Sequence, residues 1–496
     1  MALYSFYRTD KLIITILFNA LLIVTLLPSY GLSEININKS VVKIITVQSV
    51  PFEGMPWVKV VETGVTGSGF LVSNKRILTN AHVVSNQTVL QVVFNGGAKK
   101  YPARVVAVSH EADIAILSID DNTFFEDTTP LILGELPELQ DEVSVYGFPE
   151  GGDSLSITQG VVSRIEHSAY VHSSKKLLSV QIDAAINSGN SGGPVISDGK
   201  VVGIATQTLQ DSENIGYIIP PPVISHFLKD IEDGNLDGFP EIGIICQGTE
   251  NKSLTKMYGL VDGQSGVLVI YIYPGSSADG ILKKKDIILT VNNHTIADDG
   301  SVEFRPNGRT NWSYYIQQHQ VGEKIVIEFM RNGEKHIANI FLGSRNTPLV
   351  PREQYDKVAT YYIFGGLVFR PLTKHYLMMS GEDWLTEASP QLLNYLYSYP
   401  KIKGQQIVNL ISVLPNKINN GYHSFSDTVI MKVNGSRINN LKQMIKLIEK
   451  DTTSPFVEFE TINHEYIVLD RELAEKNNEK ILKTYSIPQD RSVDLM

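Results

Sequence analysis

The sequence has almost no cysteine: Cys246 is the only one among 496 residues. A lone cysteine cannot form a disulfide within the chain, so packing must supply the stability. Hydrophobic residues make up 43% of the chain, which is ordinary globular composition and enough for the cores of three or four domains of usual size.

A surplus of basic residues is also lacking, since the formal net charge is −10. This charge disfavours nucleic acids and anionic membrane surfaces as partners. The chain contains no HExxH motif, no paired CxxC motifs and no glycine-rich phosphate-binding loop. The sequence therefore predicts neither a metal nor a nucleotide cofactor.

A long apolar run stands near the start of the chain, at residues 12–27, after Arg8 and Lys11 and before Pro28. The run is shorter than the roughly 20 residues of a comfortable membrane span. A basic start, an apolar centre and small residues at the end are typical of a secretory signal, which we expect over 1–31. We favour a cleaved signal over an uncleaved membrane anchor, and we expect no other stable membrane insertion. Export of a nearly cysteine-free chain suits the periplasm of a Gram-negative bacterium.

Residues 40–220 read as short strands separated by turns, and helical periodicity is nearly absent there. Many short strands of this kind predict a sandwich or β-barrels. The spacing of the apolar residues changes at 221–234, where it becomes that of a helix between Pro222 and Gly234. We expect this helix to end a first domain spanning 38–232.

Two later segments resemble each other, at 286–296 and 428–438. Each is a strand that ends in an Asn-containing turn, and each precedes an expected helix and then a hairpin. The helices are expected over 311–319 and 439–450, and the hairpins over 324–337 and 456–469. This repeat predicts two copies of a small α+β domain, at 238–345 and 355–470. The second copy carries a partly helical insertion at 373–398, and a charged tail follows at 471–496.

Three separated residues together suggest acyl-transfer chemistry. His82 follows an apolar strand, Asp113 precedes another, and Ser191 lies in a glycine-rich turn. A serine hydroxyl needs an imidazole to take its proton, and the imidazole needs a carboxylate to orient it. Each motif alone has a plainer interpretation as a cap or a loop. Their conjunction predicts Ser191 as nucleophile, His82 as general base and then acid, and Asp113 as the orienting acid.

The glycines around the nucleophile predict an oxyanion hole at Gly189 and Asn190, because backbone N–H groups of a tight turn can donate to a developing negative charge. The N–H groups of Gly189 and Ser191 are the natural donors. Ala185 and Ile186 precede this turn, and we expect Ile186 to contribute to an uncharged pocket for small aliphatic side chains.

Four motifs resemble the protease domain of the HtrA/Deg family of serine proteases: GSGF, TNAHVV, ADIAIL and INSGNSGGPV, the last at 186–195. The resemblance implies a mainly β multidomain protein, with a double β-barrel of the chymotrypsin type followed by two PDZ-like domains. FPEIGI (239–244) resembles the carboxylate-binding loop of a PDZ domain, and the resemblance implies that Ile242, Gly243 and Ile244 bind substrate. The second copy resembles plant-type Deg proteases, with IFGGLVF (363–369) in the loop position.

The resemblance further implies an ATP-independent endopeptidase that degrades misfolded or damaged proteins in the cell envelope. Its partners would be unfolded proteins and C-terminal peptides, and its assembly a trimer or a multiple of three. His167 matches the position of a sensor-loop arginine in stress-activated relatives. A PDZ-containing chaperone or scaffold with a largely latent protease domain is the alternative.

Overall fold

The structure is a computed structural model that describes residues 37–496, except 62–63, 127, 209–214, 262, 345, 353 and 451–453. The predicted signal, residues 1–31, lies outside the described residues. Among the helices that are described, none combines the length and apolarity needed to cross a bilayer.

The first part of the predicted protease domain is an eight-stranded antiparallel sheet in the order β6-β5-β1-β3-β4-β8-β7, with β2 paired to β1. Its elements are η1 (Ile37–Lys39), β1 (Val41–Phe52), β2 (Met55–Val61), β3 (Val65–Val72), β4 (Arg76–Thr79), α2 (Ala81–Val84), β5 (Gln87–Phe94), β6 (Tyr101–Pro102), β7 (Arg104–Ser109), β8 (Ile114–Ser118) and η2 (Asn122–Phe125). β-Branched side chains such as Val42, Ile44 and Val92 fill its core. In the described residues the strand ladder does not join β6 to β7, so this half is not a closed barrel.

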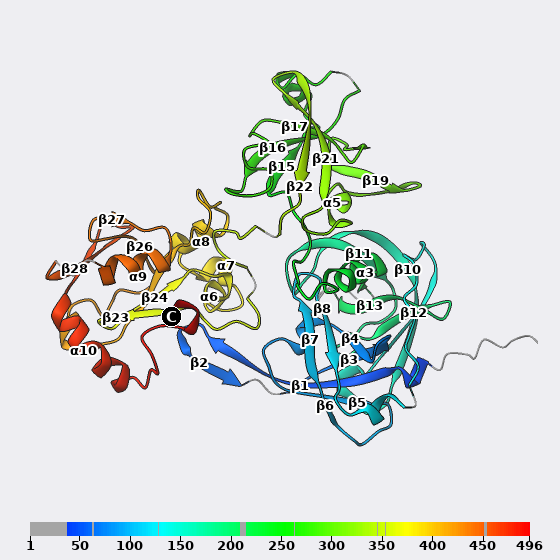
Figure 1. Cartoon of the computed structure of the whole chain (residues 1–496), viewed down its shortest axis with the longest axis horizontal. Helices are drawn as coiled ribbons and strands as arrows, with labels where there is room; N and C mark the ends of the chain where they lie inside the picture. Colours follow the sequence, from blue (N-terminus) through cyan, green and yellow to red (C-terminus); the bar gives the residue numbers. More distant parts are fainter. Residues whose placement is uncertain are drawn as a thin grey trace, which may run out of the picture. The chain divides into compact units, whose positions relative to one another are not determined.

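The second part is a closed barrel in the order β10-β11-β14-β13-β12-β9 (Figure 1). Its elements are β9 (Glu142–Gly147), η3 (Pro149–Gly151), β10 (Ser156–Ala169), β11 (Lys176–Ile182), β12 (Pro194–Ser197), β13 (Lys200–Thr208), β14 (Gly216–Ile219) and α3 (Pro221–Asp230). Helix α3 is the helix expected after the strands, and it begins at two prolines that suit a first helical turn.

The first PDZ-like domain is built on a sheet in the order β15-β16-β17-β21-β22. Its elements are β15 (Ile244–Gly248), α4 (Lys252–Met257), β16 (Val267–Ile272), β17 (Ile287–Val291), β18 (His294–Thr295), β19 (Ser301–Arg305), β20 (Gly308–Asn311), α5 (Tyr314–Gln317), β21 (Lys324–Arg331) and β22 (Glu334–Phe341). The predicted hairpin is confirmed, with Asn332 and Gly333 both at positive φ in its turn. The helix expected over 311–319 is reduced to the single turn of α5, because β20 extends to Asn311.

The second PDZ-like domain repeats this order as β24-β25-β26-β28-β29, with β23 added at one edge. Its elements are β23 (Tyr362–Phe364), β24 (Leu367–Pro371), α6 (Lys374–Met378), α7 (Trp384–Glu387), α8 (Pro390–Leu396), β25 (Val408–Val413), η4 (Lys417–Asn419), β26 (Thr428–Val433), β27 (Ser436–Arg437), α9 (Leu441–Lys450), β28 (Phe456–Thr461), β29 (Tyr466–Asp470), α10 (Arg471–Thr484) and η5 (Val493–Leu495). The matching strand orders are consistent with the predicted repeat, and α6 to α8 lie in the segment where a partly helical insertion was expected.

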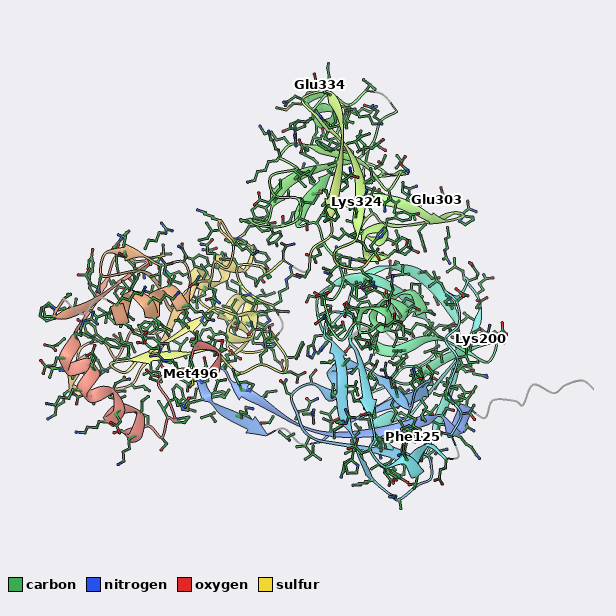
Figure 2. All side chains as sticks on the ribbon, viewed as in Figure 1. Phe125, Lys200, Glu303, Lys324, Glu334 and Met496 are labelled. Carbon is green, nitrogen blue, oxygen red and sulfur yellow. The ribbon has the colours of Figure 1, made fainter. Side chains whose placement is uncertain are left out.

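The residues after 470 do not form a separate tail, in contrast to the sequence-based expectation. Ala474 of α10 is buried in the core of the second PDZ-like domain. Beyond α10, the N–H of Ile363 donates to the carbonyl of Asp490, and the N–H of Ser492 donates to the carbonyl of Tyr361. The last residues therefore add to the β23 edge, and the chain end at Met496 belongs to this domain (Figure 2).

Candidate active site

Strand pairing brings the predicted base and acid together. β4 pairs with β8, with Thr79 opposite Ala115, so the residues that follow β4 and precede β8 meet at one end of the sheet. His82 lies in α2, and its Nδ1 is 2.8 Å from Oδ2 of Asp113. The backbone N–H of His82 also donates to Oδ1 of Asp113, at 2.9 Å. Asp113 therefore fixes both the position of the His82 backbone and the orientation of its ring.

The electrostatics of this pair favour a protonated imidazole beside an ionised carboxylate. Burial by itself would lower the pKa of His82, but the charge and hydrogen bond of Asp113 outweigh it and raise the pKa. Burial would raise the pKa of Asp113, but His82, and a hydrogen bond from Thr206, lower it. The Asp113 side chain is 3% exposed and that of His82 is 33% exposed, so only the imidazole is accessible to a substrate.

The turn that carries Ser191 requires its glycines. Gly189 has φ +97° and Gly192 has φ +87°, and an added Cβ at Gly192 would lie 2.2 Å from the carbonyl oxygen of Ser68. The N–H of Asn190 donates to the carbonyl of Asn187 at 3.0 Å. Within the described part of the chain, the N–H groups of Gly189 and Ser191 donate to no protein acceptor. The available oxyanion donors are thus Gly189 and Ser191, and Asn190 occupies the turn without supplying one.

Two hydrogen bonds through β3 connect the nucleophile turn to β4, the strand that precedes the base. The N–H of Ser68 donates to the carbonyl of Ser191 at 2.8 Å. The hydroxyl of Thr79, three residues before His82, donates to the carbonyl of Ser68 at 2.7 Å. The two halves of the protease domain are therefore held together at the predicted triad.

Thr206 is a site residue that sequence reasoning missed. Its hydroxyl donates to Oδ2 of Asp113 at 2.7 Å, and its carbonyl accepts a hydrogen bond from the Ser191 hydroxyl at 3.1 Å. In this structure the Ser191 hydroxyl therefore donates to Thr206. Among the hydrogen bonds of the described residues, none joins Ser191 to His82, so the hydroxyl must change partner before His82 can take its proton. The sequence predicted only short strands in this region, and a threonine in an apolar strand carries no signal of such a role.

Ile186, which was predicted to contribute to the substrate pocket, is buried, with 4% of its surface exposed. It packs against β14, where an added Cβ on Gly216 would lie 2.7 Å from its Cδ1 atom. An apolar side chain at this place is compatible with the uncharged pocket that the sequence predicted.

The loop FPEIGI borders a cavity of about 420 Å³ in the first PDZ-like domain, which is also lined by Trp312 and Ile316. Gly243, at the tip, has φ +78°. Ile242 is 3% exposed and belongs to the domain core, whereas Ile244 is partly buried. All three predicted residues line the cavity.

Residues of the protease domain reach this cavity. Lys175 forms an ion pair with Glu241 of the loop, and Lys175 and Lys176 line the cavity wall together with Arg352. His167 is hydrogen-bonded to Thr310 at 2.7 Å, and to Gln317 of α5. Strand β10, through His167, and the segment after it, through Lys175, therefore contact the first PDZ-like domain directly.

In the part of the chain that the structure describes, no three His, Cys, Asp or Glu side chains are grouped so that they could hold a metal ion.

Comparison with known proteins agrees with this architecture. Residues 67–204 match the trypsin-like peptidase domain, and residues 350–494 match a PDZ domain. The chain is thus a trypsin-like serine protease with a PDZ domain. The mitochondrial protease Do-like 4 of Arabidopsis thaliana is 40% identical, over 92% of this chain and 85% of its own length. The chloroplastic protease Do-like 2 of the same plant is 39% identical, over 92% of this chain and 75% of its own.

A solved structure shares the fold: the HtrA-type protease AlgW with a decapeptide has a TM-score of 0.50 and 24% identity, over 64% of this chain and 98% of that chain. The chain belongs to the HtrA/Deg family of serine proteases, which includes the Do-like proteases.

Proposed function

We propose that this protein is an ATP-independent endopeptidase that cleaves misfolded or damaged proteins by a Ser-His-Asp mechanism. The observation that carries the proposal is the hydrogen-bonded pair of Asp113 and His82 beside a turn with two free N–H donors. His82 takes the proton of Ser191 as the hydroxyl attacks the peptide carbonyl. The N–H groups of Gly189 and Ser191 then stabilise the oxyanion, and His82 returns the proton to the leaving amine.

The cavity beside FPEIGI supports capture of substrate C-termini. β15 is an edge strand, so a peptide can add to it by backbone hydrogen bonds. Lys176 and Arg352 place positive charge on the cavity wall, where it suits a terminal carboxylate. In the second PDZ-like domain, β23 occupies the corresponding edge of β24, and its Tyr362 and Phe364 are buried in the domain core. Peptide capture is therefore assigned to the first copy.

Cleavage of casein tests this function. The protein lacking residues 1–31 should degrade casein without ATP, and Ser191→Ala should reduce the rate by at least about 1,000-fold. Thermal unfolding of the variant should match that of the parent. If the parent protein leaves casein intact, even with a Val-terminated peptide added, the alternative of a PDZ scaffold with a latent protease domain is favoured.

Location and assembly are part of the proposal. Residues 1–31 have the layout of an export signal, which supports the periplasm, whereas the names of the relatives place them in mitochondria and chloroplasts. We assign the protein a role in protein quality control after its export from the cytoplasm. Cell fractionation with a C-terminally tagged chain distinguishes the periplasm from mitochondria and chloroplasts. We expect homo-oligomers in multiples of three, which native mass measurement tests; a monomer would contradict this.

A further inference from the structure

The catalytic histidine lies beside a second imidazole. His172, in the segment between β10 and β11, has its ring centroid 6.1 Å from that of His82. His172 is 7% exposed, so its ring is held inside the structure. Its Nε2 is 3.1 Å from Nδ1 of His110, which lies three residues before Asp113. A two-ring bridge, His110–His172, thus extends from the catalytic pair.

The segment that connects the two PDZ-like domains holds this bridge from the other side. The ring of Tyr355 is stacked on that of His172, with centroids 3.8 Å apart and planes at 18°. The Tyr355 hydroxyl donates to the carbonyl of His172 at 2.8 Å. Oδ2 of Asp356 is 2.9 Å from Nε2 of His110.

Asp356 is itself fixed in place. Its N–H donates to Oδ1 of Asn86 at 2.9 Å, and its carboxylate accepts the N–H of Asn86. Asn86 follows α2, the helix that carries His82. The connecting segment is therefore attached to the protease domain on both sides of the bridge.

These contacts indicate which ring nitrogens of His110 and His172 carry a proton. Burial would raise the pKa of Asp356, but hydrogen bonds from His110 and Asn86 lower it, so the carboxylate is ionised near neutral pH. An ionised carboxylate requires N–H on Nε2 of His110. Nδ1 of a neutral His110 is then an acceptor, and Nε2 of His172 donates to it. The bond between the rings is lost when both facing nitrogens carry a proton.

We propose that His172 is a positioning residue for the catalytic His82, and that Tyr355 and Asp356 keep it in place through the His110–His172 bridge. This inference rests on the proposed function. The ring centroids of His172 and His82 are 6.1 Å apart, so the bridge holds one imidazole beside the catalytic one.

Steady-state kinetics on a short peptide test the proposal. Tyr355→Ala should lower kcat about tenfold with little change in KM, whereas Tyr355→Phe, which keeps the stacked ring, should lose far less. Lys357→Ala, an exposed neighbour on the same segment, is the control and should match the parent protein.

A second measurement does not depend on activity. In the Ser191→Ala background, the NMR titration of the His82 Cε1–H should shift when Tyr355→Ala or His110→Gln is added, and not with Lys357→Ala. A Tyr355→Ala protein with the kcat of its parent, or a His82 titration unchanged by both variants, would overturn the proposal. An inactive parent protein with a shifted titration would instead contradict the proposed function and leave the bridge supported.

Discussion

Replacement of Thr206 by Val removes one hydroxyl from the site and keeps the shape of the side chain. That hydroxyl donates to the buried carboxylate of Asp113 at 2.7 Å. A hydrogen bond to a charged group contributes about 1.5–3 kcal/mol, and the buried oxygen would lose this partner. We expect the free energy of unfolding of the protease domain to fall by about that amount.

Only part of this loss should appear in catalysis, because the hydroxyl contacts Asp113 both before and during the reaction. We expect kcat to fall by about tenfold, since a mobile carboxylate orients the His82 ring less well, and KM to change little. Urea unfolding and peptide hydrolysis measure the two effects. Thr206→Ser, which keeps the hydroxyl, is the matched control. A Thr206→Val protein with the stability and kcat of its parent would refute a role for this hydrogen bond.

Two other predictions concern specificity and pH. Ile186 is apolar and Ala185 offers no carboxylate, so the predicted pocket cannot pair with a basic side chain. Peptides with Val or Ala before the cut should be cleaved more than tenfold faster than those with Lys or Arg, because an unpaired charge is costly to bury. A peptide library that is cut mainly after basic residues would contradict this pocket. Burial lowers the pKa of His167 to about 4, despite its hydrogen bond with Gln317. The unfolded chain therefore binds a proton near pH 6.5 that the folded chain does not, so stability should fall by up to about 3 kcal/mol as the pH drops from 6.5 to 4. His167→Gln should remove this dependence in urea unfolding curves, and an unchanged slope would show that the ring is not held neutral.

Much of the fold could be predicted because its signals are local. The turn after β21 needs two residues at positive φ, and Asn332 with Gly333 supplies them. The residues at 439–450 carry an apolar stripe at helical spacing, and α9 follows, beginning at Leu441. By contrast, α5 is shorter than expected, because the hairpin of β19 and β20 takes residues that also suit a helix. The tail was misjudged since a mostly charged helix buries only a few side chains, such as Ala474, against a partner distant in sequence.

The sequence by itself determined the chemistry of the site. Ser191 must lie in a turn that only glycines permit, and His82 and Asp113 must flank apolar strands, so the residue types and their local context were enough to predict the three. The tertiary structure alone decided what surrounds them: Thr206 on Asp113, the free N–H groups beside Asn190, and Tyr355 against His172. These contacts join segments that are up to 183 residues apart. No local pattern encodes such a contact, because a side chain's partners depend on which strands pair and which domain surfaces meet after the chain has folded.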